Sequence, residues 1–200
     1  MHMKKPLEKF FNLNTDEKSI ENIEPVKDGS LEIIIVSDNH LEKSGLAKVL
    51  KYHAGADYFL HCGDSNLQPN LDLMKSFITV RGNTDFLLDY ENDEVIELAT
   101  GEKVWMTHGH RFSVGFGTDH LLTQAELMNP SPAIILYGHT HKVDVKMQKG
   151  ILIINPGSIA FPRDGTHRTY AKLQIIPERY HIQILNIRNH KVVKEFQFPR

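Results

Sequence analysis

Short apolar runs recur along the chain, and each is followed by glycine or a small polar residue. The runs are Ile33–Val36, Tyr58–Leu60, Phe77–Val80, Val104–Met106, Ile134–Tyr137 and Ile151–Ile154. Runs of this kind are typical of buried β-strands. Segments with apolar residues at helical spacing lie between several of them, at Ser44–Ala54, Pro69–Ser76 and Asp119–Met128. The pattern therefore predicts an α/β fold, with Ser44 as the N-cap of the first helix.

The second half of the chain adds a pattern of hairpins. Val95–Leu98 and Val104–Met106 flank a glycine turn, and another hairpin is expected around Gln148-Lys149-Gly150. Tyr170–Ile176 and Tyr180–Ile187 alternate apolar with polar residues, as strands with one buried face do. The hairpin around Gln148-Lys149-Gly150 and these late strands together predict a second sheet.

The chain divides into an N-terminal extension, residues 1–30, and a single domain, residues 31–200. Within the extension Leu7, Phe10 and Phe11 have helical spacing, which predicts a short amphipathic helix. Packing of this helix against its own domain is favoured over a site for a partner.

Composition narrows the class of protein. With 200 residues, 40% hydrophobic and 24% charged, the chain has the size and balance of one globular domain. No apolar stretch approaches the roughly 20 residues that cross a bilayer, and the first thirty residues lack the pattern of a signal peptide. A single cysteine, Cys62, permits no internal disulfide and fits a reducing compartment. We expect a cytoplasmic protein with no membrane partner.

The formal net charge of −2 argues against a general nucleic-acid binder, which would carry a basic excess or stripe. Arg163 to Arg200 does contain eight basic residues against three acidic ones. The alternating strand pattern of this stretch indicates the solvated face of a sheet, and such a surface would attract phosphorylated substrates only weakly.

Ligand-type side chains follow five of the apolar runs. They are Asp38, His40, Asp64, Asn83, His108, His139 and His141. If the strands lie side by side, their carboxyl ends converge on one crevice, where α/β folds bind ligands. Imidazole, carboxylate and amide groups suit manganese, iron, zinc or nickel, and one cysteine excludes a cage of thiolates. The set predicts two cations about 3.5 to 4 Å apart, with Asp64 as the bridging carboxylate.

Each of these residues also has an ordinary structural interpretation. A lone Asp or His after a strand is usually a cap or turn residue, and Asn83 could occupy a left-handed turn after Gly82. Cys62 is better explained as a small buried residue than as a ligand. Histidines outside the motifs are expected in surface or core roles, and these are His53, His61, His120, His167, His181 and His190.

The five motifs, taken in order from Leu31 to Ser158 and with Asn155-Pro156-Gly157-Ser158 among them, resemble the calcineurin-like metallophosphoesterases. The resemblance is closest to their small single-domain prokaryotic branch. It implies a four-layer sandwich of two mixed β-sheets flanked by α-helices. It also implies two ligand sets, Asp38, His40, Asp64 and His141 for one ion and Asp64, Asn83, His108 and His139 for the other. Spacing alone would allow His139 and His141 to share an ion.

The chain departs from this family pattern in places. Asn39 and Leu41 stand where relatives carry Thr and Gly, and Thr84 follows Asn83 where many larger relatives carry a His. The acid that protonates the leaving group is therefore unassigned. His110 and Asp85 are the nearest candidates, and a metal-bound water is an alternative. Arg111, which follows the fourth motif, is a candidate substrate contact.

The expected function is hydrolysis of a small phosphodiester or phosphomonoester by in-line attack of a hydroxide held between two divalent ions, manganese being favoured. The chain has no Gly-x-Ser-x-Gly elbow and no Walker-type phosphate loop. The resemblance leaves a second possibility, a protein-binding scaffold similar to a retromer coat subunit. A nuclease is disfavoured by the charge balance. Self-association is common among related small enzymes, which makes a homo-oligomer possible.

Overall fold

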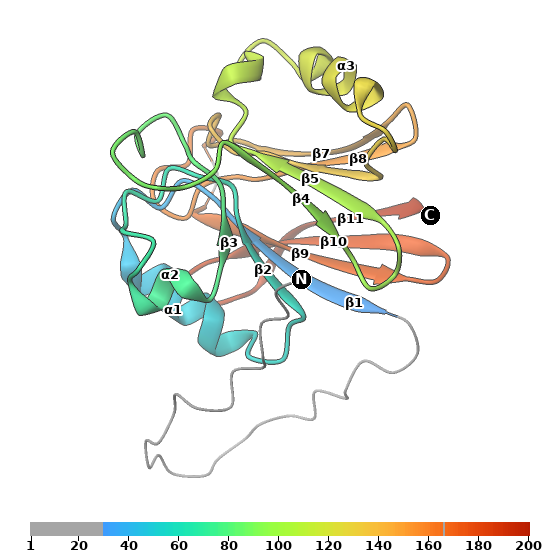
Figure 1. The fold of residues 1–200 in the computed structure, drawn as a ribbon. Coiled ribbons are helices and arrows are strands. Elements are labelled where there is room, and N and C mark those ends of the chain that lie inside the picture. Colours follow the sequence, from blue (N-terminus) through green and yellow to red (C-terminus); the bar gives the residue numbers. More distant parts are fainter. Residues whose placement is uncertain (1–29, 166) are drawn as a thin grey trace.

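Two β-sheets stacked face to face form the centre of the computed structural model, which describes residues 30–165 and 167–200 (Figure 1). The expected helix around Leu7, Phe10 and Phe11 lies outside these residues. The first sheet has the strand order β11-β10-β9-β1-β2-β3. Its strands are β1 (Leu31–Val36), β2 (Tyr58–His61), β3 (Ile78–Thr79), β9 (Thr169–Ile176), β10 (Arg179–Asn186) and β11 (Val192–Pro199).

The second sheet has the order β4-β5-β6-β8-β7. Its strands are β4 (Asp93–Glu97), β5 (Lys103–Thr107), β6 (Ile134–Leu136), β7 (Val143–Gln148) and β8 (Ile151–Pro156). Both sheets are mixed. Strands β1, β2 and β3 are mutually parallel, as are β5, β6 and β8, whereas β4, β7, β9, β10 and β11 each pair with their neighbours in antiparallel fashion.

Helices cover the outer faces, so that the layers run helix, sheet, sheet, helix (Figure 1). On the first sheet lie α1 (Lys43–Tyr52) and α2 (Asp72–Lys75), and on the second lies α3 (Asp119–Leu127). A short 3-10 helix, η1 (His110–Phe112), follows β5. The sequence-based prediction of a four-layer sandwich is confirmed.

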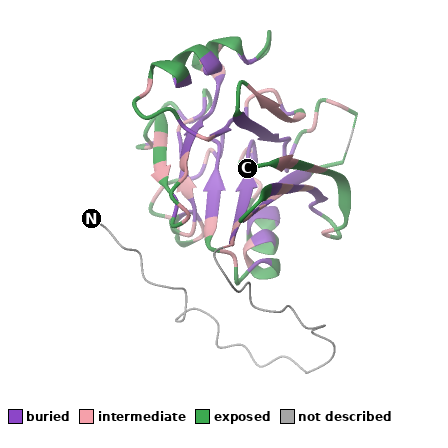
Figure 2. Ribbon diagram, turned by 90° about the vertical axis from the view of Figure 1, so that its right-hand side faces the viewer, coloured by how far each residue is buried: buried purple, intermediate pink, exposed green. Residues whose placement is uncertain are grey.

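Successive side chains of a strand point to opposite faces of its sheet, which explains how the layers pack together. In β1, Ile33 and Ile35 pack in the core between the sheets, while Ile34 and Val36 face α1. In β5, Trp105 faces α3 and its neighbours face the other sheet. Both faces of each central strand are therefore buried, which is why these strands have continuous apolar sequences. Figure 2 shows this buried interior, with exposure confined to the helices, loops and outer strands.

Three sequence-based expectations need correction. The ligand-bearing strands do not share one sheet, because β1 to β3 belong to the first sheet and β5, β6 and β8 to the second. The late strands β9 to β11 extend the first sheet instead of forming a separate one. The N-cap of α1 is Glu42, not Ser44: the Glu42 carboxylate accepts the backbone N–H groups of Ser44 (3.0 Å) and Gly45 (2.7 Å).

Candidate metal centre

Loops at the carboxyl ends of five strands from both sheets meet at one edge of the sandwich. Loop-to-loop hydrogen bonds hold them in register. The backbone N–H of His40 donates to the carbonyl of Asp64 at 3.1 Å, which extends the β1–β2 pairing into the loops. The backbone N–H of His139 donates to the Asp38 carboxylate at 3.1 Å and so joins the two sheets. All seven predicted ligand side chains lie in this cluster of loops.

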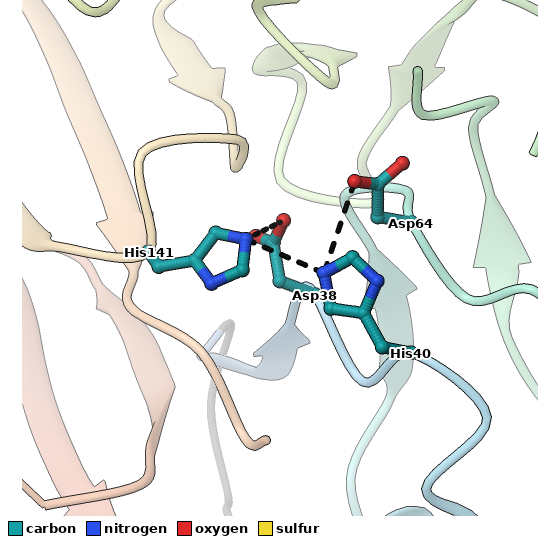
Figure 3. Close-up of side chains that lie close together, drawn as sticks. All are labelled: Asp38, His40, Asp64 and His141. Carbon is teal, nitrogen blue, oxygen red and sulfur yellow. Dashed lines mark hydrogen bonds and ion pairs between the residues drawn. The ribbon is translucent and has the colours of Figure 1, made fainter. Parts of the chain in front are cut away.

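Four of the seven form one compact group, shown in Figure 3. Asp38, His40, Asp64 and His141 each offer a ligand atom, and these atoms all lie within 4.8 Å of one another. The Nε2 atom of His141 is 3.1 Å from Oδ1 of Asp38 and 3.3 Å from Nε2 of His40. The Nε2 atom of His40 is 3.9 Å from Oδ2 of Asp64. This spacing suits a single cation enclosed by the four groups.

The other three candidates meet beside this group. Oδ1 of Asn83 lies 3.1 Å from Nε2 of His108 and 2.8 Å from Nδ1 of His139. The same Nε2 of His108 is 3.4 Å from Oδ2 of Asp64. Oδ2 of Asp64 therefore faces both groups, as a carboxylate that bridges two cations would.

Hydrogen bonds determine which ring nitrogens carry protons. Nδ1 of His108 lies 2.7 Å from the carbonyl of Cys62, and Nδ1 of His141 lies 2.7 Å from the carbonyl of Phe161. A carbonyl only accepts, so both Nδ1 atoms must donate. Nδ1 of His40 donates likewise to the amide oxygen of Asn66 (3.1 Å). In the neutral rings all three Nε2 atoms therefore present lone pairs to the centre, as metal-ligating histidines do.

The carboxylates are oriented in a corresponding way. Oδ2 of Asp38 accepts hydrogen bonds from the Ser37 hydroxyl (2.6 Å) and from the backbone N–H of His139. Its Oδ1 atom is buried and lies 3.1 Å from Nε2 of His141, so among the described residues it accepts no hydrogen bond as long as that ring is neutral. Oδ1 of Asp64 accepts from the backbone N–H of Thr84 at 2.8 Å, which leaves Oδ2 facing the histidines. When the rings are neutral, lone pairs on nitrogen and oxygen thus converge with no hydrogen-bond donor between them, and a buried cation would stabilise this arrangement. The residues fit a divalent metal.

The ionisation of the same groups reflects this concentration of negative charge. Burial opposes the charged form of His108, but its hydrogen bond with Asp64 and the nearby carboxylates raise its pKa. The pKa of His141 is raised through Asp38 in the same way, against the effect of burial. Burial would raise the pKa of each aspartate, yet the histidines lower the pKa of both. The carboxylates therefore favour the protonated forms of His108 and His141, and a bound cation would take the place of these protons.

The loop backbone is strained where it presents these side chains. Five of the seven candidate ligands have positive φ angles, namely Asp38 (54°), His40 (43°), Asp64 (54°), His139 (68°) and His141 (58°). Only a few per cent of non-glycine residues adopt this left-handed conformation. Such strain accumulates at functional sites, where the surrounding structure holds it in place.

A second set of residues supports the loops. The side-chain amide of Asn155 donates to the carbonyl of Gly138 (2.8 Å), and the Ser158 hydroxyl donates to the carbonyl of Asp38 (2.8 Å). These contacts explain the Asn155-Pro156-Gly157-Ser158 motif, to which no role could be given from sequence. Its residues tie the end of β8 to the loops after β1 and β6.

Three further sequence-based candidates occupy different environments. Asp85 is buried, and its carboxylate accepts backbone N–H groups from Asn66 (2.6 Å), Gly82 (2.9 Å) and Ser65 (3.3 Å). This arrangement supports the loops and presents no free donor. The ring of His110 lies 5.4 Å from that of His108, at an interplanar angle of 53°. Arg111 is exposed on η1.

Burial, followed by the charges of His108 and His139, lowers the pKa of His110. At neutral pH His110 is therefore a neutral ring beside the centre. Its Nδ1 atom is buried and without a hydrogen-bond partner among the described residues.

The structure shows the surroundings of two of the three departures from the family pattern, Asn39 and Leu41. Asn39 is buried, and its oxygen accepts a hydrogen bond from Nε2 of His61 (2.8 Å) while its amide donates to the Glu42 carbonyl (3.0 Å). Leu41 has a φ of 70°, a conformation that glycine adopts without strain, and its side chain is exposed. Cys62 is buried, as expected, and burial raises the pKa of its thiol.

Comparisons with known proteins agree with this site. Residues 31–176 match the profile of the calcineurin-like phosphoesterase superfamily domain. The chain is 33% identical over 146 residues to the probable metallophosphoesterase YsnB of Bacillus subtilis (strain 168), a match that covers 72% of this chain and 85% of that protein.

Solved structures give the same picture. A conserved protein of Streptococcus pneumoniae TIGR4, described as a predicted phosphoesterase, has a TM-score of 0.79 at 32% identity, covering 86% of this chain and 98% of that one. Vacuolar Protein Sorting 29 of Cryptosporidium parvum shares the fold, with a TM-score of 0.70 at 17% identity over 86% of this chain and 100% of that chain.

The helices of residues 30–165 and 167–200 all fall short of the length and apolar character that crossing a bilayer requires. The sandwich of two sheets, the Asp and His cluster that fits a divalent metal, and the match over residues 31–176 lead to one conclusion. This chain belongs to the calcineurin-like phosphoesterase superfamily.

Proposed function

We propose that this protein is a binuclear metal-dependent phosphoesterase that hydrolyses a small phosphodiester or phosphomonoester. The observation that carries the proposal is the convergence of histidine Nε2 atoms and carboxylate oxygens at one edge of the sandwich. Oδ1 of Asp38 is buried there without a donor, and the Nδ1 atoms of His108 and His141 are committed to backbone carbonyls. Such a set is suited to holding cations.

Two ligand sets share Asp64 in this proposal. Asp38, His40, Asp64 and His141 would hold one ion, which is supported by the mutual spacing of their ligand atoms within 4.8 Å. Asp64, Asn83, His108 and His139 would hold the other, which is supported by the meeting of His108 and His139 at the Asn83 oxygen. Nitrogen and oxygen donors without thiolates suit manganese, and iron, zinc or nickel are alternatives.

When bound, two divalent ions lower the pKa of a water and neutralise the charge that develops on the phosphoryl oxygens. The protein contributes the shape of the site. The backbone N–H of Thr84 and the carbonyls of Cys62 and Phe161 hold the ligands in orientation before substrate arrives. A preformed set of this kind avoids reorganisation during the reaction.

One residue beside the centre, His110, is a candidate for assisting the departure of the leaving group. Burial lowers the pKa of His110, so little imidazolium would be present at neutral pH, and the ring would meet the leaving group as a neutral N–H hydrogen-bond donor. Asp85 is committed to three backbone N–H groups and is dropped from this role in the proposal. Arg111 is retained only as an exposed residue that an extended substrate could reach.

The experiment measures metal content and turnover together. Protein dialysed against manganese, nickel, cobalt or zinc is analysed for bound metal and assayed with bis(4-nitrophenyl) phosphate and 4-nitrophenyl phosphate. We expect about two ions per chain, and a loss of at least roughly 100-fold in kcat/KM for Asp64→Asn and His108→Ala. His120→Ala is the matched control, since it removes an exposed imidazole from α3.

The same experiment decides between enzyme and scaffold. The likeness to Vacuolar Protein Sorting 29 concerns the fold, and the intact ligand set favours catalysis. Full metal loading with no turnover of either ester would support a protein-binding scaffold instead.

A cytoplasmic location is also part of the proposal and is supported by the single unpaired cysteine. The net charge of −2 supports a small substrate over a nucleic acid.

A further inference from the structure

A cleft of about 430 Å³ opens directly beside the candidate metal centre. Its wall includes His139 and Thr140, which belong to the ligand-bearing loop after β6, so the cleft and the centre share a boundary. Small-molecule sites typically have volumes of about 300 to 1,000 Å³. A single phosphate at the metal ions would leave this space free for another part of a larger substrate.

The charged groups of the cleft are mainly positive. Lys142 and Arg163 line it, and both are exposed. Among the described residues neither forms an ion pair with a carboxylate within 4.0 Å. The carboxylate in the wall, Asp144, is already bound by the Tyr137 hydroxyl (2.7 Å) and the Lys146 ammonium (2.8 Å). Two cations are therefore left to meet an anion.

The backbone fixes these two positions relative to the centre. Lys142 follows the candidate ligand His141 in the chain, and the backbone N–H of Arg163 donates to the His141 carbonyl at 3.0 Å. The loop after β8 is thereby held against the loop after β6. Arg111, the substrate contact expected from sequence, is not among the residues that line the cleft.

We infer that Arg163 and Lys142 bind a second phosphate group of the substrate, separate from the phosphate that is cleaved. This inference rests on the proposed function. It narrows the substrate class to small phosphoesters that carry another phosphate a few bonds away. A guanidinium offers a planar pair of donors to phosphate, and a nearby ammonium adds a compact positive charge, so the two cations complement each other.

The test uses ligands that the enzyme cannot hydrolyse. Manganese-loaded protein, freed of excess metal, is titrated calorimetrically with alkane-α,ω-bisphosphonates of three to six carbons and with alkylphosphonates of the same lengths. Their carbon–phosphorus bonds resist hydrolysis. We expect at least one bisphosphonate to bind roughly tenfold more tightly than its monophosphonate partner. An ω-phosphonocarboxylate of the same length shows whether a carboxylate can replace the second phosphate.

Variants of the two cleft residues test whether Arg163 and Lys142 cause the tighter binding of the bisphosphonate. In Arg163→Gln and Lys142→Gln the preference for the bisphosphonate should fall, and in the double variant it should disappear. Arg163→Lys should retain part of it, because the charge remains while the planar donor pair is lost. Lys75→Gln is the control, since it removes one positive charge from the exposed surface of α2.

Turnover of bis(4-nitrophenyl) phosphate separates the two claims. If the protein hydrolyses this diester but binds no bisphosphonate more tightly than its partner, the inference is wrong and the proposed function stands. An affinity gain that persists unchanged in the double variant also overturns it. Absence of both metal binding and turnover would contradict the proposed function, and the inference with it.

Discussion

Gly138 leaves room at the point where the two sheets meet. A Cβ atom built on it would lie 2.0 Å from the Ser37 hydroxyl oxygen and 2.8 Å from Oδ2 of Asp38. The hydrogen bond between these two atoms orients the Asp38 carboxylate. The close approach explains why glycine precedes the His139 motif.

We predict that Gly138→Ala displaces the Asp38 carboxylate. The overpacking should lower the free energy of unfolding by about 2 kcal/mol and weaken manganese binding at least roughly tenfold. Urea denaturation and metal titration measure the two effects. Gly55→Ala is the control, because a Cβ there meets nothing within 4 Å. Unchanged metal affinity in Gly138→Ala would show that this packing does not position Asp38.

Asp85 provides a second prediction for a single residue. In Asp85→Asn one acceptor oxygen becomes an amide that faces a backbone N–H, so a buried donor is left unpaired. We expect a loss of about 1 to 3 kcal/mol in the free energy of unfolding. A role as leaving-group acid predicts something else, a fall in kcat that grows with the pKa of the leaving group while stability is unchanged. Denaturation curves and a series of aryl esters distinguish the two.

Residue types identified the seven candidate ligands, because imidazole and carboxylate after strand ends are informative by themselves. The supporting roles of Asp85, Asn155 and Ser158 could not be identified in this way. Their partners are distant in the sequence: Asn155 holds the Gly138 carbonyl and Ser158 holds the Asp38 carbonyl. Common polar residues such as these acquire a role only when folding supplies the partner. The cations of the cleft, Lys142 and Arg163, were missed for the same reason.

At the scale of secondary-structure elements, a chain of hydrogen bonds on the face opposite the sheet interface ties α1 to the β10–β11 hairpin. Nδ1 of His53 lies 3.4 Å from the Glu32 carboxylate, and its Nε2 atom is 2.9 Å from the Tyr170 hydroxyl. The same hydroxyl is 2.8 Å from Nδ1 of His190, whose ring stacks on Tyr52. The hydrogen bond from His53, against burial, lowers the pKa of Glu32.

We predict that Tyr170→Phe loosens this connection without affecting catalysis. Two ring nitrogens, on His53 and His190, lose a common partner, so the free energy of unfolding should fall by about 1 to 2 kcal/mol. Thermal denaturation and hydrogen exchange at the β10–β11 turn measure the change. Tyr58→Phe, at a half-buried tyrosine of β2, serves as control. Equal stability of wild type and Tyr170→Phe would contradict the structural role of the network.

Element positions followed from sequence where periodicity was strong. Buried strands such as β1 and β6 and the helix α3 lie where the apolar pattern predicts them. Assignment of strands to sheets was less successful, because both sheets contain similar apolar segments. The predicted N-cap of α1, Ser44, was wrong. The side chain of Glu42 caps the helix instead, because it accepts hydrogen bonds from two backbone N–H groups of the first turn.

At the scale of the whole molecule, the candidate ligands come from both sheets, so a cation bound there joins the two halves of the sandwich. A ligand that binds only the folded state stabilises it by mass action. Manganese at 100 times its dissociation constant should add about 2.7 kcal/mol to the free energy of unfolding, or roughly 5 to 10 °C to Tm. A chelator should reverse the effect. Differential scanning calorimetry measures the rise in Tm. The rise should be smaller in His108→Ala. An equal rise in that variant would place the stabilising ion elsewhere.

The α/β class, the buried strands and the kinds of atoms available to a metal all follow from the amino-acid sequence alone. Local physical chemistry is sufficient for these, because burial period and ligand chemistry are properties of single segments. Only the tertiary structure decided which strands share a sheet, which ring nitrogens face inward and where Lys142 and Arg163 lie beside the centre. These features depend on contacts between residues that are often more than a hundred positions apart, such as that of Asp38 with His141, and such contacts exist only once the chain has folded.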